Sequence, residues 1–182
     1  MVALAGRSNV GKSSLLNRLV GARGLARVSR TPGRTRQVNY FLVDECLVLM
    51  DLPGYGYARV PTRTRAGWGP LSEAALSKSG GPALTLLLVD GRRPATELDM
   101  MMASWLAARG LAWVPVLTKT DKLAAGERAA ALKAAGRLGA PRPAMVTSAR
   151  TGEGIAGLWK EIEKEARPRP GDLKPIGRTD RA

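Results

Sequence analysis

Histidine is absent from this 182-residue sequence, and cysteine occurs once, as Cys46. Without histidine, no imidazole is present to act as a general base or as a metal ligand. A single cysteine excludes an intramolecular disulfide framework and favours a reducing compartment, so we expect a cytoplasmic location. No apolar run reaches the roughly 18 residues that a membrane span needs, and the start shows no secretory pattern. We therefore expect no stable insertion into a membrane.

Acidic residues are scarce beside basic ones. The chain has 15 Asp and Glu against 29 Lys and Arg, which gives a formal net charge of +14. Residues 1–43 contain eight basic residues and no acidic one. Such clustering is typical of proteins that bind polyanions. The alternative is an arginine-rich composition that reflects genomic base bias or adaptation to heat, but this explains abundance better than clustering.

Apolar runs alternate with amphipathic ones, which is typical of a parallel sheet with crossover helices. Asp44 and Glu45 lie between two strand-like runs and predict a tight hairpin, which makes residues 39–44 the one antiparallel edge strand. The sequence thus predicts an α/β fold with a six-stranded, mostly parallel sheet and about five helices. The predicted strands are residues 2–5, 39–44, 46–51, 83–90, 111–117 and 144–147. The predicted helices are residues 13–20, roughly 64–77, 96–109, 126–138 and 154–167.

Two predicted loops, residues 21–38 and 52–63, are longer than ordinary connections, and loops of that length in a compact domain are usually functional. The end of the chain, residues 168–182, contains three prolines and little apolar content. We expect one domain over residues 1–167, followed by a basic and flexible tail at 168–182.

The segment after the first predicted strand fits the pattern G-x-x-x-x-G-K-[ST] at Gly6, Gly11, Lys12 and Ser13. Glycines in such a loop let backbone N–H groups turn inward around phosphate oxygens, at the positive end of the following helix. Lys12 would then reach the β- and γ-phosphates, and the Ser13 hydroxyl would ligate Mg²⁺. On this motif alone, an ordinary strand–turn–helix is the alternative.

A second motif follows the third predicted strand, at the end where ligands gather in open α/β sheets. The carboxylate of Asp51 is suited to hold Mg²⁺ through water, and the N–H of Gly54 is suited to meet the γ-phosphate. The loop beyond Gly54 would therefore respond to hydrolysis of the nucleotide.

A third group of residues indicates the base. Asp121 follows a later strand, and its carboxylate is suited to accept the N1 and N2 donors of guanine, a pair that adenine lacks. Lys119 would lay its methylene groups against the base, and residues 147–149 would offer a backbone N–H to guanine O6. A helix cap is the alternative for Asp121. Because the motifs occur in order and each lies at a strand end, they indicate GTP and GDP as ligands.

With these motifs the sequence resembles the EngB/YihA/YsxC family of ribosome-biogenesis GTP-binding proteins, which are translation-factor-type P-loop GTPases. The resemblance runs from residue 2 to about 165. It departs at the start, where members usually have a further segment before the first strand. It implies a three-layer P-loop GTPase domain and a switch in assembly of the large ribosomal subunit. The matching segments are residues 6–14, 31–35, 51–56 and 118–121.

The resemblance also implies a role for Thr35, which matches the family's switch threonine and would add its hydroxyl and carbonyl around Mg²⁺ and the γ-phosphate. An ordinary polar loop residue is the alternative. The predicted catalytic residues are Lys12, Thr35 and Gly54, and the predicted Mg²⁺ ligands are Ser13, Thr35 and Asp51. The predicted nucleotide-binding residues are Gly6, Arg7, Ser8, Asn9, Val10, Gly11, Lys12, Ser13, Ser14, Gly33, Arg34, Thr35, Asp51, Leu52, Pro53, Gly54, Thr118, Lys119, Thr120, Asp121, Thr147, Ser148 and Ala149.

Two positions bear on hydrolysis. Tyr55 stands where Ras-like GTPases use glutamine to orient water, so we expect weak intrinsic hydrolysis that a partner stimulates. Asn9 matches the asparagine that helps to bind K⁺ in some related GTPases. The alternative for Asn9 is a hydrogen bond to the loop backbone.

Three functions stay open at this point. The first is a GTP-driven switch whose ordered loops bind the rRNA of a large-subunit precursor. The second is a nucleotide-gated rRNA-binding scaffold. The third is a GTPase of the septum or membrane surface, linked to cell division, for which the basic tail would suit anionic lipid. We expect a monomer in each case.

Overall fold

The computed structural model describes residues 1–21, 38–43, 47–56, 69–77 and 81–166 of the chain. Several predictions lie outside these residues: the hairpin at Asp44 and Glu45, most of both long loops, and the tail at 168–182.

The described strands form one sheet of six strands in the order β2-β3-β1-β4-β5-β6. All neighbouring pairs are parallel except β2 and β3, which are antiparallel. The predicted sheet and its antiparallel edge strand are therefore confirmed. The strands are β1 (Val2–Gly6), β2 (Asn39–Val43), β3 (Leu47–Asp51), β4 (Leu84–Asp90), β5 (Trp113–Thr118) and β6 (Met145–Val146).

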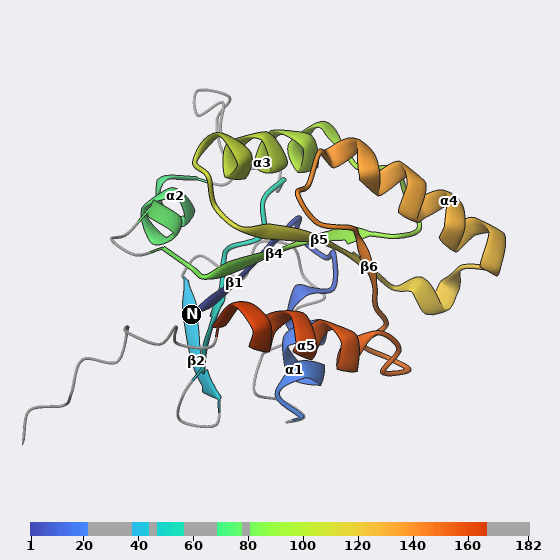
Figure 1. The fold of residues 1–182 in the computed structure, drawn as a ribbon, viewed down its shortest axis with the longest axis horizontal. Helices are drawn as coiled ribbons and strands as arrows, with labels where there is room; N and C mark the ends of the chain where they lie inside the picture. Colours follow the sequence, from blue (N-terminus) through green and yellow to red (C-terminus); the bar gives the residue numbers. More distant parts are fainter. Residues whose placement is uncertain (22–37, 44–46, 57–68, 78–80, 167–182) are drawn as a thin grey trace, which may run out of the picture.

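Helices cover both faces of the sheet. Figure 1 shows α1 and α5 on one face and α2, α3 and α4 on the other, so the predicted three-layer arrangement is confirmed. The helices are α1 (Lys12–Leu19), α2 (Gly69–Ser77), α3 (Glu97–Ala108), α4 (Ala125–Ala135) and α5 (Ile155–Ala166), with 3₁₀ turns η1 (Thr120–Lys122) and η2 (Gly136–Leu138). No helix in the described ranges has the length and apolar character to cross a membrane.

The central strand β1 explains why two cores form. All five of its residues are buried, because a parallel strand between two helical layers has no solvent-facing side. Successive side chains point to opposite faces. Val2 and Leu4 belong to the cluster under α1 and α5, whereas Ala3 and Ala5 belong to the cluster under the other helices.

The structure corrects some predicted bounds. The helix predicted at 126–138 ends at Ala135 and tightens into η2, which brings Leu138 into the core at 6% exposure before Gly139 turns into the left-handed region. The strand predicted at 144–147 is only two residues long. Helix α1 begins one residue earlier than predicted, at Lys12.

The sheet register brings the ends of four strands to one edge. Leu4 pairs with Asp51 and Asp90 pairs with Thr118, so β1, β3, β4 and β5 all finish there. Strand β1 lies where the chain order of the strands reverses, and ligands of open α/β sheets bind at such a point.

Candidate functional site

The loop between β1 and α1 is turned by two left-handed residues. Asn9 has φ 64° and Gly11 has φ 109°. This turn places the loop amides and the start of α1 at the carboxyl end of β1. The first helical residues are Lys12, Ser13 and Ser14. Both serines are half-buried. A glycine-containing turn at a helix N-terminus is an arrangement that binds phosphate.

A buried ion pair joins this loop to β3. Lys12 Nζ lies 2.5 Å from Asp51 Oδ1, and the two side chains are only 8% and 4% exposed. The predicted phosphate-binding lysine and the predicted Mg²⁺ carboxylate therefore meet at one point. Ser13, the other described Mg²⁺ candidate, follows Lys12 directly. Removal of one member would leave the other charge buried without compensation.

The chain after β3 is hydrogen-bonded along the phosphate loop. Tyr55 N donates to Gly6 O at 3.3 Å, and Ser8 N donates to Tyr55 O at 2.9 Å. The hydroxyl of Ser8 donates to Gly54 O at 3.1 Å. A Cβ on Gly54 would lie 2.9 Å from Ser8 Cα, so only glycine permits this approach. The two predicted phosphate-binding motifs are thus held in contact.

The side chain of Tyr55 points away from that contact. It is 2% exposed, and its hydroxyl donates to Asp99 Oδ1 of α3 at 2.8 Å. Burial, and then the charge of Asp99, raise the pKa of Tyr55 well above its usual value. The tyrosine therefore ties the start of the second long loop to α3. Two of the predicted nucleotide-binding residues, Leu52 and Val10, have side chains in the core.

The predicted guanine-binding carboxylate is held by two donors. Ser148 Oγ donates to Asp121 Oδ1 and Arg150 Nε donates to Oδ2, each at 2.8 Å. The Ser148 hydroxyl, and with it the guanidinium of Arg150, hold the pKa of Asp121 below its usual range although burial opposes them. Asp121 therefore remains an ionised acceptor at neutral pH, as recognition of the guanine N–H groups requires.

Three of the predicted threonines use their hydroxyls inside the protein. Thr118 Oγ1 donates to Val10 O at 2.6 Å, Thr120 Oγ1 to Thr147 O at 3.0 Å, and Thr147 Oγ1 to Leu117 O at 2.9 Å. All three threonines are buried. Their side chains join β5, β6 and the phosphate loop, which places the neighbouring Lys119, Asp121 and half-buried Ala149 at the edge of the site.

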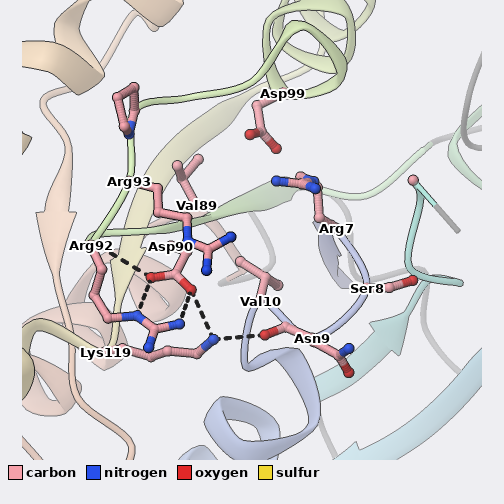
Figure 2. A pocket seen from close by; sticks show the side chains of 12 residues that line it. Arg7, Ser8, Asn9, Val10, Val89, Asp90, Arg92, Arg93, Asp99 and Lys119 are labelled. Carbon is pink, nitrogen blue, oxygen red and sulfur yellow. Dashed lines mark hydrogen bonds and ion pairs between the residues drawn. The ribbon is translucent and has the colours of Figure 1, made fainter. Parts of the chain in front are cut away.

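Lys119 links the segment that contains Asp121 to the phosphate loop. Its backbone is left-handed, with φ 60°, and its ammonium donates to Asn9 O at 2.7 Å and to Asp90 Oδ2 at 2.9 Å (Figure 2). The Cε atom lies 3.7 Å from the position of a Cβ on Gly11, so the lysine stem runs beside the phosphate loop.

Sequence reasoning missed Asp90, Arg92 and Arg150. Asp90 ends a buried strand at the same edge as Asp51, and Arg150 directly follows the predicted 147–149 segment, so both positions carried a signal. Burial opposes ionisation of Asp90, but hydrogen bonds from Arg92 and Lys119 outweigh it and hold its pKa well below the usual range.

A cleft of about 460 Å³ lies on the outer face of the phosphate loop. Arg7, Asn9, Arg92 and Lys119 line it, and Figure 2 shows the Arg7 guanidinium on the side of α3. Within the described residues, Arg7 Nε is buried and has no hydrogen-bond partner. The predicted residues Gly33, Arg34 and Thr35 lie outside the described ranges.

The described residues fit a magnesium-bound nucleotide. Backbone amides, the Lys12 ammonium and a helix N-terminus suit phosphate, whereas the Ser13 hydroxyl and the Asp51 carboxylate are the hard oxygen ligands that Mg²⁺ prefers. Pro53, two residues after Asp51 in the chain, is half-buried. The site can therefore hold a charged triphosphate at one corner and a purine with two N–H donors at the other.

Residues 1–119 match the family model described as "50S ribosome-binding GTPase". A probable GTP-binding protein EngB of Pelotomaculum thermopropionicum is 50% identical over 167 residues, which covers 87% of this chain and 84% of that protein. The corresponding protein of Geobacter metallireducens is 48% identical over 164 residues, with 89% and 80% covered.

Solved structures show the same fold. A crystal structure of a probable EngB superposes with a TM-score of 0.70 at 22% identity and covers 91% of this chain and 98% of that one. Era of Aquifex aeolicus, bound to GDP and aluminium fluoride, gives 0.74 at 22% identity, with 92% and 56% covered. The identity to full-length relatives and the family match together show that the chain belongs to the EngB family of GTP-binding proteins and is a GTPase of that family.

Proposed function

We propose that this GTPase is a switch in assembly of the large ribosomal subunit and acts as a cytoplasmic monomer. GTP orders the loops beside the site, the ordered chain binds an rRNA-rich surface, and hydrolysis releases it. The observation that carries the proposal is the junction of a phosphate corner and a guanine corner through Lys119. The matching family description names binding to the 50S ribosome. A structure of Era with a TM-score of 0.69 contains MgGDPNP and a segment of 16S rRNA.

In this proposal the domain of residues 1–167 binds the nucleotide. The loop amides and Lys12 bind the phosphates, and Ser13, Asp51 and Thr35 hold Mg²⁺. Bound Mg²⁺ neutralises charge that develops on the phosphate oxygens. Gly54 brings its backbone next to the phosphate loop, where its N–H is available to the terminal phosphate. Asp121 accepts the guanine N–H groups.

We also propose that intrinsic hydrolysis is slow and that a partner stimulates it. The side chain of Tyr55 is buried and bonded to Asp99, so it does not supply the group that orients water in Ras-like enzymes. The hydrolysis rate with and without ribosomal particles tests this. A rate that particles leave unchanged contradicts it.

A bound K⁺ at Asn9 would supply part of the missing charge stabilisation. Asn9 is exposed, and among the described residues its side chain makes no hydrogen bond to the loop backbone. Hydrolysis should rise in K⁺ but not in Na⁺, and Asn9→Ala should abolish the rise while GTP still binds. Equal rates in the two salts contradict this part of the proposal.

The cluster of arginines in residues 21–38 is proposed as an RNA contact. Each phosphate contact releases counterions, so affinity falls as salt rises. Replacement of Arg27, Arg30, Arg34 and Arg36 by alanine should flatten the salt dependence of RNA binding. If the salt dependence of RNA binding is unchanged, the RNA contacts another part of the protein.

A pull-down of ribosomal particles tests the switch itself. The protein is loaded with GDP or with a non-hydrolysable GTP analogue, and the retained particles are identified. Selective retention of large-subunit precursors by the GTP-analogue form supports the switch. Equal retention in both forms contradicts nucleotide control, and binding of anionic vesicles without particles favours a membrane-surface role linked to cell division.

A further inference from the structure

The carboxylate of Asp90 is held from both sides. Its Oδ1 accepts from Arg92 N at 3.2 Å and from Arg92 Nε at 2.8 Å. Its Oδ2 accepts from Arg92 Nη2 at 2.7 Å and from Lys119 Nζ at 2.9 Å. The two Arg92 side-chain bonds form a bidentate fork, which fixes the plane of the carboxylate. All four acceptor positions of Asp90 are therefore used (Figure 2).

The backbone supports this arrangement. Asp90 is the last residue of β4 and pairs with Thr118, so its side chain is delivered beside the segment that starts with Lys119. Gly91 N donates to Thr118 O at 3.0 Å and continues the contact past the end of the strand. The position of the carboxylate relative to Lys119 is thus determined by strand register.

The Lys119 ammonium bridges Asp90 and the carbonyl of Asn9. Asn9 has φ 64°, in the left-handed region that asparagine adopts more readily than most other non-glycine residues. The ammonium bonds the carbonyl of that residue directly. The chain of contacts therefore runs from Arg92 through Asp90 and Lys119 to the turn of the phosphate loop.

We propose that Asp90 is a positioning residue for guanine-nucleotide binding. Its carboxylate holds Lys119 so that the lysine methylene groups lie along the site and the lysine ammonium donates to the Asn9 carbonyl. Arg92 acts indirectly, because its guanidinium holds the carboxylate of Asp90 in place. The inference rests on the proposed nucleotide site and is independent of any ribosomal partner.

Loss of the Asp90 charge would free the lysine. The Lys119 side chain is 27% exposed, so water would replace the carboxylate and the long side chain would sample other rotamers. The nucleotide would then have to order both the lysine and the loop turn on binding. Dissociation should become faster, whereas the choice of guanine over other bases, which Asp121 determines, should not change.

The test is a double-mutant cycle on GDP binding, with a fluorescent GDP and stopped-flow release. Asp90→Asn should raise the dissociation constant about 10- to 100-fold, the range for one charge-assisted hydrogen bond. Arg92→Ala should raise it less, about 3- to 10-fold, since Asp90 itself remains. Arg93→Ala is the matched control, because Arg93 is an exposed arginine of the same loop whose side chain makes no bond to the Asp90 carboxylate among the described residues. Its backbone N–H donates to Asp90 O at 3.1 Å, and alanine keeps that bond, so the change should alter GDP binding less than 2-fold.

The cycle is completed in a Lys119→Met background. If Asp90 acts through the lysine, Asp90→Asn should change GDP binding there less than 2-fold. An equal effect in both backgrounds, or a loss of guanine-over-xanthine selectivity, overturns the inference. If Asp90→Asn does not fold, Arg92→Ala in the two backgrounds decides in the same way. A wild-type protein that binds no GDP would instead overturn the proposed nucleotide site.

Discussion

Two ion pairs at the same sheet edge differ sharply in their surroundings. Lys12 and Asp51 at the phosphate corner are 8% and 4% exposed, whereas Arg150 at the guanine corner is 74% exposed beside an Asp121 that is 6% exposed. Both pairs join a cation to a carboxylate within 2.8 Å. The two pairs therefore differ in the burial of the cation and not in the distance between the charges. A buried charge that loses its partner is costly, but an exposed guanidinium is replaced by water.

The difference follows from where each cation lies in the fold. Lys12 is in the first turn of α1, above the central strand, and its neighbours Leu15 and Leu16 are fully packed. Arg150 lies on the loop after β6, at the end of the sheet. The Lys12–Asp51 pair is thus buried among the packed residues of α1 and β3, and the guanine corner is open on the Arg150 side.

The largest expected effect is on stability at the phosphate corner. Lys12→Met leaves Asp51 buried without a cation and should lower the free energy of unfolding by about 3 kcal/mol, measured by urea denaturation without nucleotide. The double change Lys12→Met with Asp51→Leu removes both charges and should recover most of the loss. A single variant as stable as the unmodified protein would show that the pair is not buried in solution.

The next effect concerns ligand choice at the guanine corner. Asp121→Asn replaces an acceptor with a donor opposite a guanine N–H and should weaken GTP binding about 100-fold, while xanthine nucleotides gain affinity. Competition between GTP, XTP and ATP for the same site measures this. Equal affinity of the unmodified protein for ATP and GTP would remove the assigned role of Asp121.

A smaller effect should appear as a pH dependence at Asp90, which lies between the two corners. The folded protein lowers the pKa of Asp90, so its ion pairs stabilise the fold above the unfolded value of about 4 and lose that contribution as pH falls below it. Arg92→Ala should cost about 1 kcal/mol at pH 7, after allowance for solvent screening. The gap in unfolding free energy between the two proteins should narrow progressively as pH falls below about 4, because the unfolded chain takes up the Asp90 proton there and the folded protein takes it up only at lower pH. A gap that is independent of pH contradicts the assignment.

The smallest effect is expected at Arg150. Arg150→Ala should change the free energy of unfolding by less than about 0.5 kcal/mol, because water replaces an exposed partner of Asp121. Arg150→Lys serves as the control that keeps the charge. A loss as large as that of Lys12→Met would remove the distinction between the two corners.

Much of the fold was predictable because it depends on local patterns. The apolar runs predicted all six strands, and the short Asp-Glu connection predicted the antiparallel edge strand that β2 and β3 form. Predicted ends were less accurate at α4, where the chain tightens into η2, buries Leu138 and then turns at the left-handed Gly139. The residue at which a helix ends depends on which side chains can pack in the core, and the local sequence pattern does not contain that information.

The sequence by itself determined the chemistry of the site. A glycine-rich turn with Lys12 and Ser13, and a carboxylate at Asp121, are combinations of donors and acceptors whose ligands follow from their hydrogen-bonding capacity. Only the tertiary structure decided which charged groups meet. Lys12 meets Asp51 across 39 residues, and Lys119 meets Asp90 across 29, because the strand register brings their backbones to one edge. Contacts between residues far apart in the chain depend on that register and on packing, whereas a motif depends only on its neighbours.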